Sequence, residues 1–218
     1  IEEHGRKAGR FTVRLEGVRS ATVSAEIVER LGLREGVVLT VPQVAALRDA
    51  AAALRTFDRA LNMLAARARS STELRRKLVE KGEPPALADQ AIARLTTLGL
   101  LNDDEYARQV ARGRLLGGAS KRRVQQELWR RGVARDVADD AVAEIVADEE
   151  VDEEDSAVRV ARRKAASLAK LDAPTRRRRL YGFLARRGYD HAAIRAAMAQ
   201  VLDAAEVESL GDEPLGEE

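Results

Sequence analysis

The segment ELRRKLVEKG, residues 73–82, has two counterparts further along the chain, and the three together decide the fold. VQQELWRRG ends at Gly132 and LYGFLARRG ends at Gly188, and both align with the first segment without gaps. In each copy an apolar residue lies eight positions before the glycine and a leucine lies four before it, which predicts a helix with one buried stripe. The glycine suits the end of that helix because it enters the left-handed region without a Cβ penalty. The stripe residues are Leu74 and Leu78, Val124 and Leu128, and Leu180 and Leu184.

Small or apolar residues also recur nine, ten and thirteen positions after each glycine, and this spacing predicts a second helix in each copy. A further helix is expected before each pair, at about 57–68, 103–115 and 153–169. The helix starts are marked by Ser70 with Glu73, by Ser120 and by Pro174. The sequence therefore predicts a mainly α protein with three tandem three-helix repeats in an elongated array, since such units complete their cores against neighbours.

The first fifty residues have a different pattern. RFTVRLEG, residues 10–17, alternates apolar and polar residues, and GVVLTV, residues 36–41, is a second strand candidate. Between them Ser24 opens a short helix that ends near Gly32. Thr40 and Gln43 form a capping box that starts a helix through VAALRDAAAALR. These features predict a small N-terminal module that contains β-strands.

The expected division of the chain follows from these patterns. It comprises the β-containing module at 1–50, a linker helix with repeat 1 at 51–101, repeat 2 at 102–150, repeat 3 at 151–203 and a disordered acidic tail at 204–218.

The charges are segregated, although the formal net charge is only +2. Residues 148–155, DEEVDEED, hold seven acids, whereas residues 159–195 hold twelve lysines or arginines against two aspartates. Seven further acids and no base follow from Asp203 to Glu218. Segregation of this kind favours an anionic partner.

The sequence lacks the residues that several classes of function require. There is no cysteine, and the two histidines, His4 and His191, are far apart in sequence. The phosphate-loop patterns GxxxxGK[ST] and GxGxxG are absent, and LLGGAS at 115–120 is expected to be an interhelical loop instead of a phosphate nest. No stretch approaches the roughly 20 apolar residues of a membrane span, and no signal peptide opens the chain. We therefore expect a cytoplasmic protein with no catalytic residues, no metal site, no cofactor and no membrane contact.

A helical wheel identifies the outward positions of the glycine-terminated helices, when the buried stripe faces inward. In repeat 1 these positions hold Thr72, Glu73 and Glu80, so this face is not basic. In repeats 2 and 3 they hold arginines, some of them in a first helical turn, where a cation opposes the macrodipole. Such arginines predict an interaction with an anionic partner such as DNA, the alternative being a merely solvated face. They are Arg122, Arg123, Arg130, Arg178, Arg179 and Arg186.

Two motifs resemble those of the RecX family of recombinase regulators: RARSSTELRRKLVEKG at 67–82 and GLLNDDEYA at 99–107. The resemblance covers roughly residues 57–203 and leaves 1–50 outside it. It implies tandem three-helix repeats that bind along the groove of the RecA–DNA filament. It also implies inhibition of ATP hydrolysis, strand exchange and coprotease activity of RecA, without a cofactor.

Two hypotheses about function stay open at this point. In the first, the chain is a monomeric RecX-like modulator whose arginines meet the DNA backbone and the recombinase within a filament. In the second, it is a free-standing DNA-binding protein with helix-turn-helix-like units. Outward aromatic candidates are few, namely Trp129 and Tyr181, so contact with phosphates of single- or double-stranded DNA is expected over base stacking.

Overall fold

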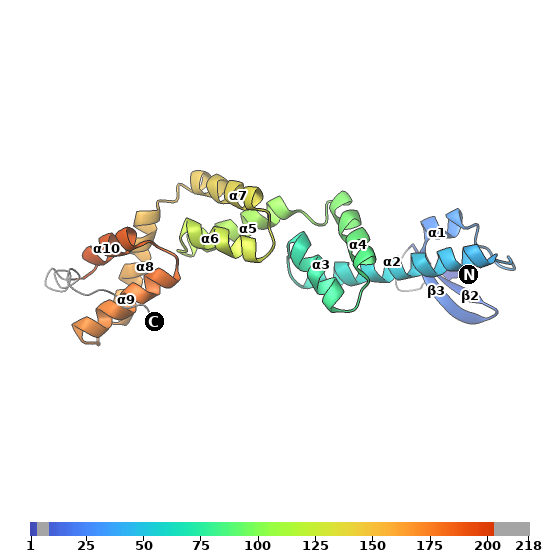
Figure 1. Cartoon of the computed structure of the whole chain (residues 1–218), viewed down its shortest axis with the longest axis horizontal. Coiled ribbons are helices and arrows are strands. Elements are labelled where there is room, and N and C mark those ends of the chain that lie inside the picture. Colours follow the sequence, from blue (N-terminus) through green and yellow to red (C-terminus); the bar gives the residue numbers. More distant parts are fainter. Residues whose placement is uncertain (4–8, 203–218) are drawn as a thin grey trace. The chain divides into compact units, whose positions relative to one another are not determined.

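The computed structural model describes residues 1–3 and 9–202, so the acidic tail expected to be disordered lies outside the described residues. The chain divides into two compact units, Ile1–Asn102 and Asp103–Glu218. The first unit holds the N-terminal module and repeat 1, and the second holds repeats 2 and 3 (Figure 1).

The N-terminal module is built on a small antiparallel sheet. Within the described residues its strands are β1 (Glu2–Glu3), β2 (Arg10–Leu15) and β3 (Val18–Ser24), in the order β1-β2-β3. Glu16 and Gly17 connect β2 to β3 with φ of 50° and 80°, and two positive φ values suit a tight hairpin turn of type I′. Val13, Val23 and Leu33 pack against the long helix that follows.

Two expectations for the first half of the chain were wrong. GVVLTV is no strand: residues 37–40 are loop, and Val41 begins helix α2 (Val41–Ala66), because the Thr40–Gln43 capping box and Pro42 start a helix there. The second long strand is β3, which leads into the short helix α1 (Ala25–Arg30) that was predicted after Ser24. The helix expected at 57–68 is also the continuation of α2, since no glycine or proline interrupts the alanine-rich run.

The three repeats have the predicted three-helix plan. Repeat 1 combines the C-terminal half of α2 with α3 (Ser71–Glu80) and α4 (Pro85–Thr97). Repeat 2 consists of α5 (Asp103–Leu116), α6 (Lys121–Arg130) and α7 (Arg135–Asp148). Repeat 3 consists of α8 (Glu153–Ser167), α9 (Ala173–Arg186) and α10 (His191–Ala199).

The buried stripe lies where the sequence predicts it. All six stripe residues on α3, α6 and α9 are fully buried, each pair in the core of its own repeat. Ala91, Ala141 and Ala197, nine positions after the glycines, are buried as well. Each repeat therefore has a small separate core in which three helices meet, as the spacing indicates.

The ends of the glycine-terminated helices are also as predicted. Ser70 Oγ accepts from the Glu73 amide at 3.1 Å, and Ser120 Oγ accepts from the Arg123 amide at 3.2 Å. The glycines after α3, α6 and α9 adopt the left-handed conformation with φ of 87°, 81° and 89°. This conformation directs following amides to the last carbonyls of the helix.

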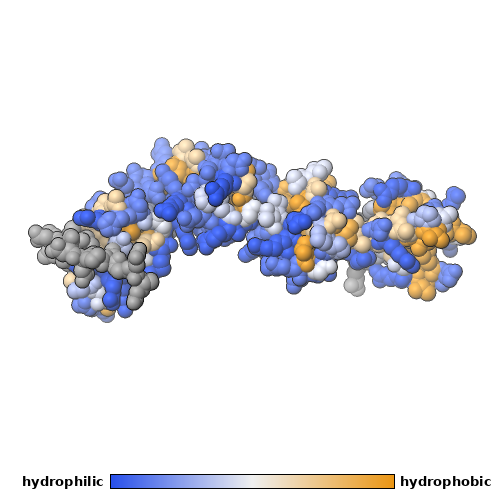
Figure 2. All heavy atoms as spheres, viewed as in Figure 1, coloured by the Kyte–Doolittle hydropathy of each residue, from blue (hydrophilic) through white to orange (hydrophobic). Residues whose placement is uncertain are grey.

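The surface differs in character along the chain. Figure 2 shows hydrophobic residues gathered over the N-terminal module, where Val18, Val38 and Val41 are strongly exposed. The visible surface of repeat 2 is mainly hydrophilic. In the part of the chain that the structure describes, no helix is both long and apolar enough to cross a membrane.

Candidate nucleic-acid interface

Helices α6 and α9 carry the six predicted arginines. Because the stripe residues of both helices point into their cores, the opposite faces meet solvent. Arg123 is half-buried, and the exposed members of the set are Arg122, Arg130, Arg178, Arg179 and Arg186.

A joint between repeats 2 and 3 brings the C-terminal end of α9 against the N-terminal end of α6. The Ser120 amide donates a hydrogen bond to the Arg187 carbonyl oxygen at 3.0 Å. The Arg187 guanidinium donates to the carbonyl oxygens of Gly117 at 2.6 Å and Gly118 at 2.9 Å. Tyr189 Oη donates to the same Gly118 oxygen at 3.2 Å. The GGAS part of the LLGGAS segment, residues 117–120, is thus an interhelical loop, as expected, and its Gly117 and Gly118 carbonyls bind the next repeat.

Two glycines allow this close approach. A Cβ on Gly188 would lie 2.5 Å from Ser120 Oγ and 2.6 Å from Arg123 Cβ, and one on Gly118 would overlap a methyl group of Val160. Both positions also have a positive φ. Side chains are excluded there for two independent reasons, one steric and one conformational.

The joint borders a basic groove of about 650 Å³, the repeat 2–3 groove. An adjoining hollow of about 380 Å³ shares Arg123 and Arg186 with it and adds Arg122. The groove also contains the carboxylate of Glu127. Its cationic lining consists of Arg114, Arg123, Arg130, Arg131, Arg186 and Arg187.

Glu127 holds two of these arginines in place. Its carboxylate accepts from Arg114 at 2.8 Å and from Arg131, and Arg131 in turn donates to Tyr106 Oη at 2.9 Å. Burial opposes ionisation of Glu127, but the hydrogen bonds from Arg114 and Arg131 outweigh it and lower the pKa of the carboxyl group. The carboxylate is therefore charged at neutral pH and offsets part of the positive charge inside the groove.

Four arginines of the groove and its adjoining hollow have fewer internal partners. Arg122, Arg123, Arg130 and Arg186 form no salt bridge with a carboxylate among residues 1–3 and 9–202, and Arg130 only donates to the Gln126 carbonyl at 3.3 Å. The structure therefore brings together four of the six predicted arginines. Arg178 and Arg179 do not line the groove and lie nearer the start of α9.

Sequence reasoning missed three members of the groove, Arg114, Arg131 and Arg187. Arg187 and Arg131 directly precede the glycines of their repeats, and Lys81 holds the same place in repeat 1. This recurrence was a usable signal. Arg114 comes from α5, outside the aligned helices, so no repeat pattern pointed to it.

In repeat 1 the structure contradicts one prediction of the helical wheel. Glu73 was predicted to face outward, yet it is only 6% exposed, and its carboxylate accepts hydrogen bonds from Arg67 and Arg69. A helical wheel describes α3 in isolation, but the segment before α3 covers the first turn of this helix and buries Glu73. Glu80 is exposed as predicted and pairs with Lys77 at 2.6 Å. The two outward carboxylates predicted for repeat 1 are thus paired with basic side chains of the same repeat.

The two aromatic candidates are integrated into the fold. Trp129 is half-buried, with the Arg135 guanidinium 4.9 Å from its ring centroid, and Tyr181 is half-buried with its hydroxyl 3.2 Å from His191 Nδ1. Neither ring is an open platform for a base. Over the described ranges, no group of three or more His, Cys, Asp or Glu side chains is placed to hold a metal ion.

Comparison with protein families matches each repeat to a family model. Residues 57–95 match "RecX, first three-helix domain", residues 102–142 match "RecX, second three-helix domain" and residues 152–198 match "RecX, third three-helix domain". The matches follow the order of the repeats in the structure.

Comparison with individual proteins agrees. A regulatory protein RecX from Mycolicibacterium vanbaalenii is 40% identical over 134 residues, which is 60% of this chain and 73% of the relative. One from Clostridium perfringens is 27% identical over 193 residues and covers 88% and 89% of the two chains. A crystal structure of a regulatory protein RecX has a similar fold, with a TM-score of 0.69 at 21% identity over 88% of this chain and 93% of that one.

Proposed function

Since the chain belongs to the RecX family of regulatory proteins, we propose that it is a negative regulator of the RecA recombinase. It binds along the groove of the RecA–DNA filament and inhibits ATP hydrolysis, strand exchange and coprotease activity. It acts in the cytoplasm as a monomer, by binding alone and without catalysis or a cofactor. Its partners are the filament and the DNA backbone.

The observation that carries this proposal is a cluster of four arginines in and beside the repeat 2–3 groove that form no salt bridge within the described residues, namely Arg122, Arg123, Arg130 and Arg186. Elsewhere many arginines are neutralised within the fold, for example Arg10 by Asp58 at 2.7 Å and Arg112 by Glu149 at 2.8 Å. Exposed cations held close together repel one another, and the fold gains little from them. Their positions suit an external polyanion such as the phosphates of DNA, which arginine binds through two parallel hydrogen bonds.

Arg178 and Arg179 extend the same surface along α9. Arg179 lies seven residues before Arg186, so the two share one side of the helix at a separation of roughly 10 Å. Both side chains are exposed. We assign them to the outer part of the binding surface, beyond the groove.

The test measures ATP hydrolysis by RecA on single-stranded DNA with and without this protein. The key variant carries Arg122→Glu, Arg130→Glu and Arg186→Glu, and we expect it to stay folded and to lose inhibition. Binding to duplex DNA should also become less dependent on salt, since each lost phosphate contact removes about 0.9 from the logarithmic slope. The control carries Arg162→Glu, Arg163→Glu and Arg195→Glu, which are exposed residues of repeat 3 outside the groove.

The outcomes of this experiment distinguish the proposed binding surface from three alternatives: a different face, an effect of net charge alone, and a free-standing DNA-binding protein. A folded groove variant that still inhibits RecA fully would show that the wrong face has been assigned. A control as damaged as the groove variant would show that only net charge matters. Wild-type protein that binds DNA tightly and leaves RecA unaffected would support the free-standing DNA-binding protein instead.

A further inference from the structure

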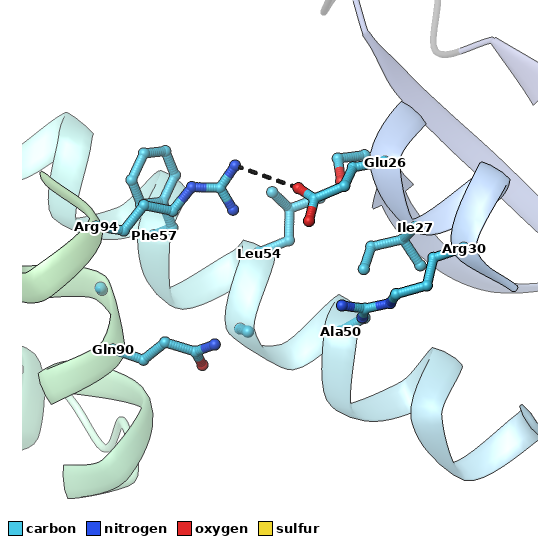
Figure 3. A pocket seen from close by; sticks show the side chains of 11 residues that line it. Glu26, Ile27, Arg30, Ala50, Leu54, Phe57, Gln90 and Arg94 are labelled. Carbon is cyan, nitrogen blue, oxygen red and sulfur yellow. Dashed lines mark ion pairs between the residues drawn. The ribbon is translucent and has the colours of Figure 1, made fainter. Parts of the chain in front are cut away.

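A second concave site lies in the first unit, where residues of α1, α2 and α4 line one pocket (Figure 3). This α1–α2–α4 pocket has a volume of about 130 Å³. Leu54, Phe57 and Ala91 form its buried floor, and Ile27 and Ala50 complete the apolar wall. A dry apolar cavity of roughly 150 Å³ accommodates one benzene-sized group, so this pocket has room for one apolar side chain.

Charged side chains surround this apolar floor. Glu26 of α1 and Arg94 of α4 approach each other across the pocket at 3.9 Å, and the Arg94 guanidinium lies 5.1 Å from the Phe57 ring centroid. Arg30 stands on the far side, and Gln90 extends into the pocket from α4 (Figure 3). Among the residues that the structure describes, Arg30 forms no salt bridge. The rim thus carries two guanidinium groups against one carboxylate.

We propose that the α1–α2–α4 pocket binds an acidic peptide segment of a partner protein. One leucine or phenylalanine of the segment inserts between Leu54, Phe57 and Ala91, and carboxylates beside it contact Arg30 and Arg94. A basic segment would be repelled by both arginines, and a neutral one would leave Arg30 without a partner. The pocket shares no residue with the repeat 2–3 groove, so the proposal does not depend on the function assigned to that groove.

The apolar anchor is tested with two synthetic peptides, acetyl-Gly-Asp-Glu-Leu-Glu-Asp-Gly-amide and the same peptide with alanine in place of leucine. Binding to the ¹⁵N-labelled full chain is followed by two-dimensional NMR. The leucine peptide should shift the amides of Ala91 and Arg94 and bind about tenfold or more tightly than the alanine peptide, because a buried leucine side chain contributes far more than alanine. Equal affinity for the two peptides would overturn the proposal.

The charges and the shape of the pocket are tested with three variants. Arg30→Gln should weaken the leucine peptide about tenfold, as expected for a hydrogen bond between charged groups. Arg48→Gln, an exposed arginine of α2 outside the pocket, is the matched control and should change affinity by less than twofold. Ala53→Leu fills the pocket from α2 and should abolish the preference for leucine while DNA binding stays at the wild-type level.

Two results would refute this assignment. Equal weakening by Arg30→Gln and Arg48→Gln would mean that general charge attracts the peptide. A folded Ala53→Leu variant that keeps the leucine preference would place the anchor elsewhere. If Ala53→Leu does not fold, the comparison of the two surface arginines still decides the question, because neither supports the core.

Discussion

Replacing Gly188 with alanine, and comparing it with Gly82→Ala, measures how strongly the joint between repeats 2 and 3 depends on a missing side chain. Both glycines end a helix with nearly the same φ, 89° at Gly188 and 87° at Gly82. The conformational cost of an alanine at positive φ, about 1 kcal/mol, is therefore common to both variants. Their surroundings differ, since a Cβ on Gly82 meets nothing within 4 Å, whereas one on Gly188 collides with Ser120 and Arg123.

The additional cost at Gly188 can be worked out from these contacts. Relieving overlaps of 2.5 and 2.6 Å requires α9 to move away from α6, and such overpacking costs about 1–3 kcal/mol. The movement also weakens the hydrogen bonds of Arg187 and Tyr189 to the Gly117–Gly118 carbonyls. We expect Gly82→Ala to lower the free energy of unfolding by about 1 kcal/mol and Gly188→Ala by about 2–4 kcal/mol.

Urea unfolding followed by far-ultraviolet circular dichroism measures the two variants side by side. Gly188→Ala should also weaken DNA binding, because the walls of the repeat 2–3 groove separate, whereas Gly82→Ala, in repeat 1, should bind as the wild type does. Equal destabilisation by the two substitutions would refute the steric argument and leave only the shared conformational term.

Three further expectations concern charged groups. Glu73→Arg should unfold repeat 1 in a thermal scan, because a buried cation would then face Arg67 and Arg69; retention of the wild-type melting temperature would contradict the burial of Glu73. The lowered pKa of Glu127 means that its ionised form stabilises the fold above the ordinary carboxyl pKa, and that this contribution is lost as pH falls through the folded-state pKa. The difference in urea midpoint between wild type and Glu127→Gln should therefore shrink from pH 7 to pH 3, and a constant difference would exclude this linkage. Deletion of 204–218 should strengthen binding to naked DNA at low salt, measured by fluorescence anisotropy, since six acids then no longer compete for arginines, and unchanged affinity would leave the tail without this role.

Periodicity predicted the repeats well because it depends on local spacing alone. Leu74 and Leu78, like their counterparts, lie on the apolar face of a short helix, and this face is buried in the core of the repeat. The same method failed at Glu73, whose burial comes from Arg67 and Arg69 in the preceding segment. A helical wheel contains no information about which neighbouring chain covers a face.

The candidate site was predictable only in part for a similar reason. Arg130 and Arg186 are outward on their own helices, so a wheel finds them. The groove itself depends on the contact of Gly188 with Ser120, which joins residues 68 positions apart and has no signature in spacing. The GVVLTV segment failed differently, since its strand propensity competes with the helix start at Thr40, and the capping box prevails.

Helix α2 contributes to two cores, so its length between them sets both their separation and their relative rotation about the helix axis. Leu47 and Ala51 belong to the core of the N-terminal module, and Phe57 and Ala60 belong to that of repeat 1. One residue inserted between Ala51 and Phe57 would turn one group against the other by about 100° and displace it by about 1.5 Å. Seven inserted residues would restore the phase to within about 20° but separate the cores by roughly 10 Å. An insertion or deletion in this stretch of α2 therefore rotates the N-terminal module relative to repeat 1. The module faces α4 as it does here only when the number of residues between the two cores is unchanged.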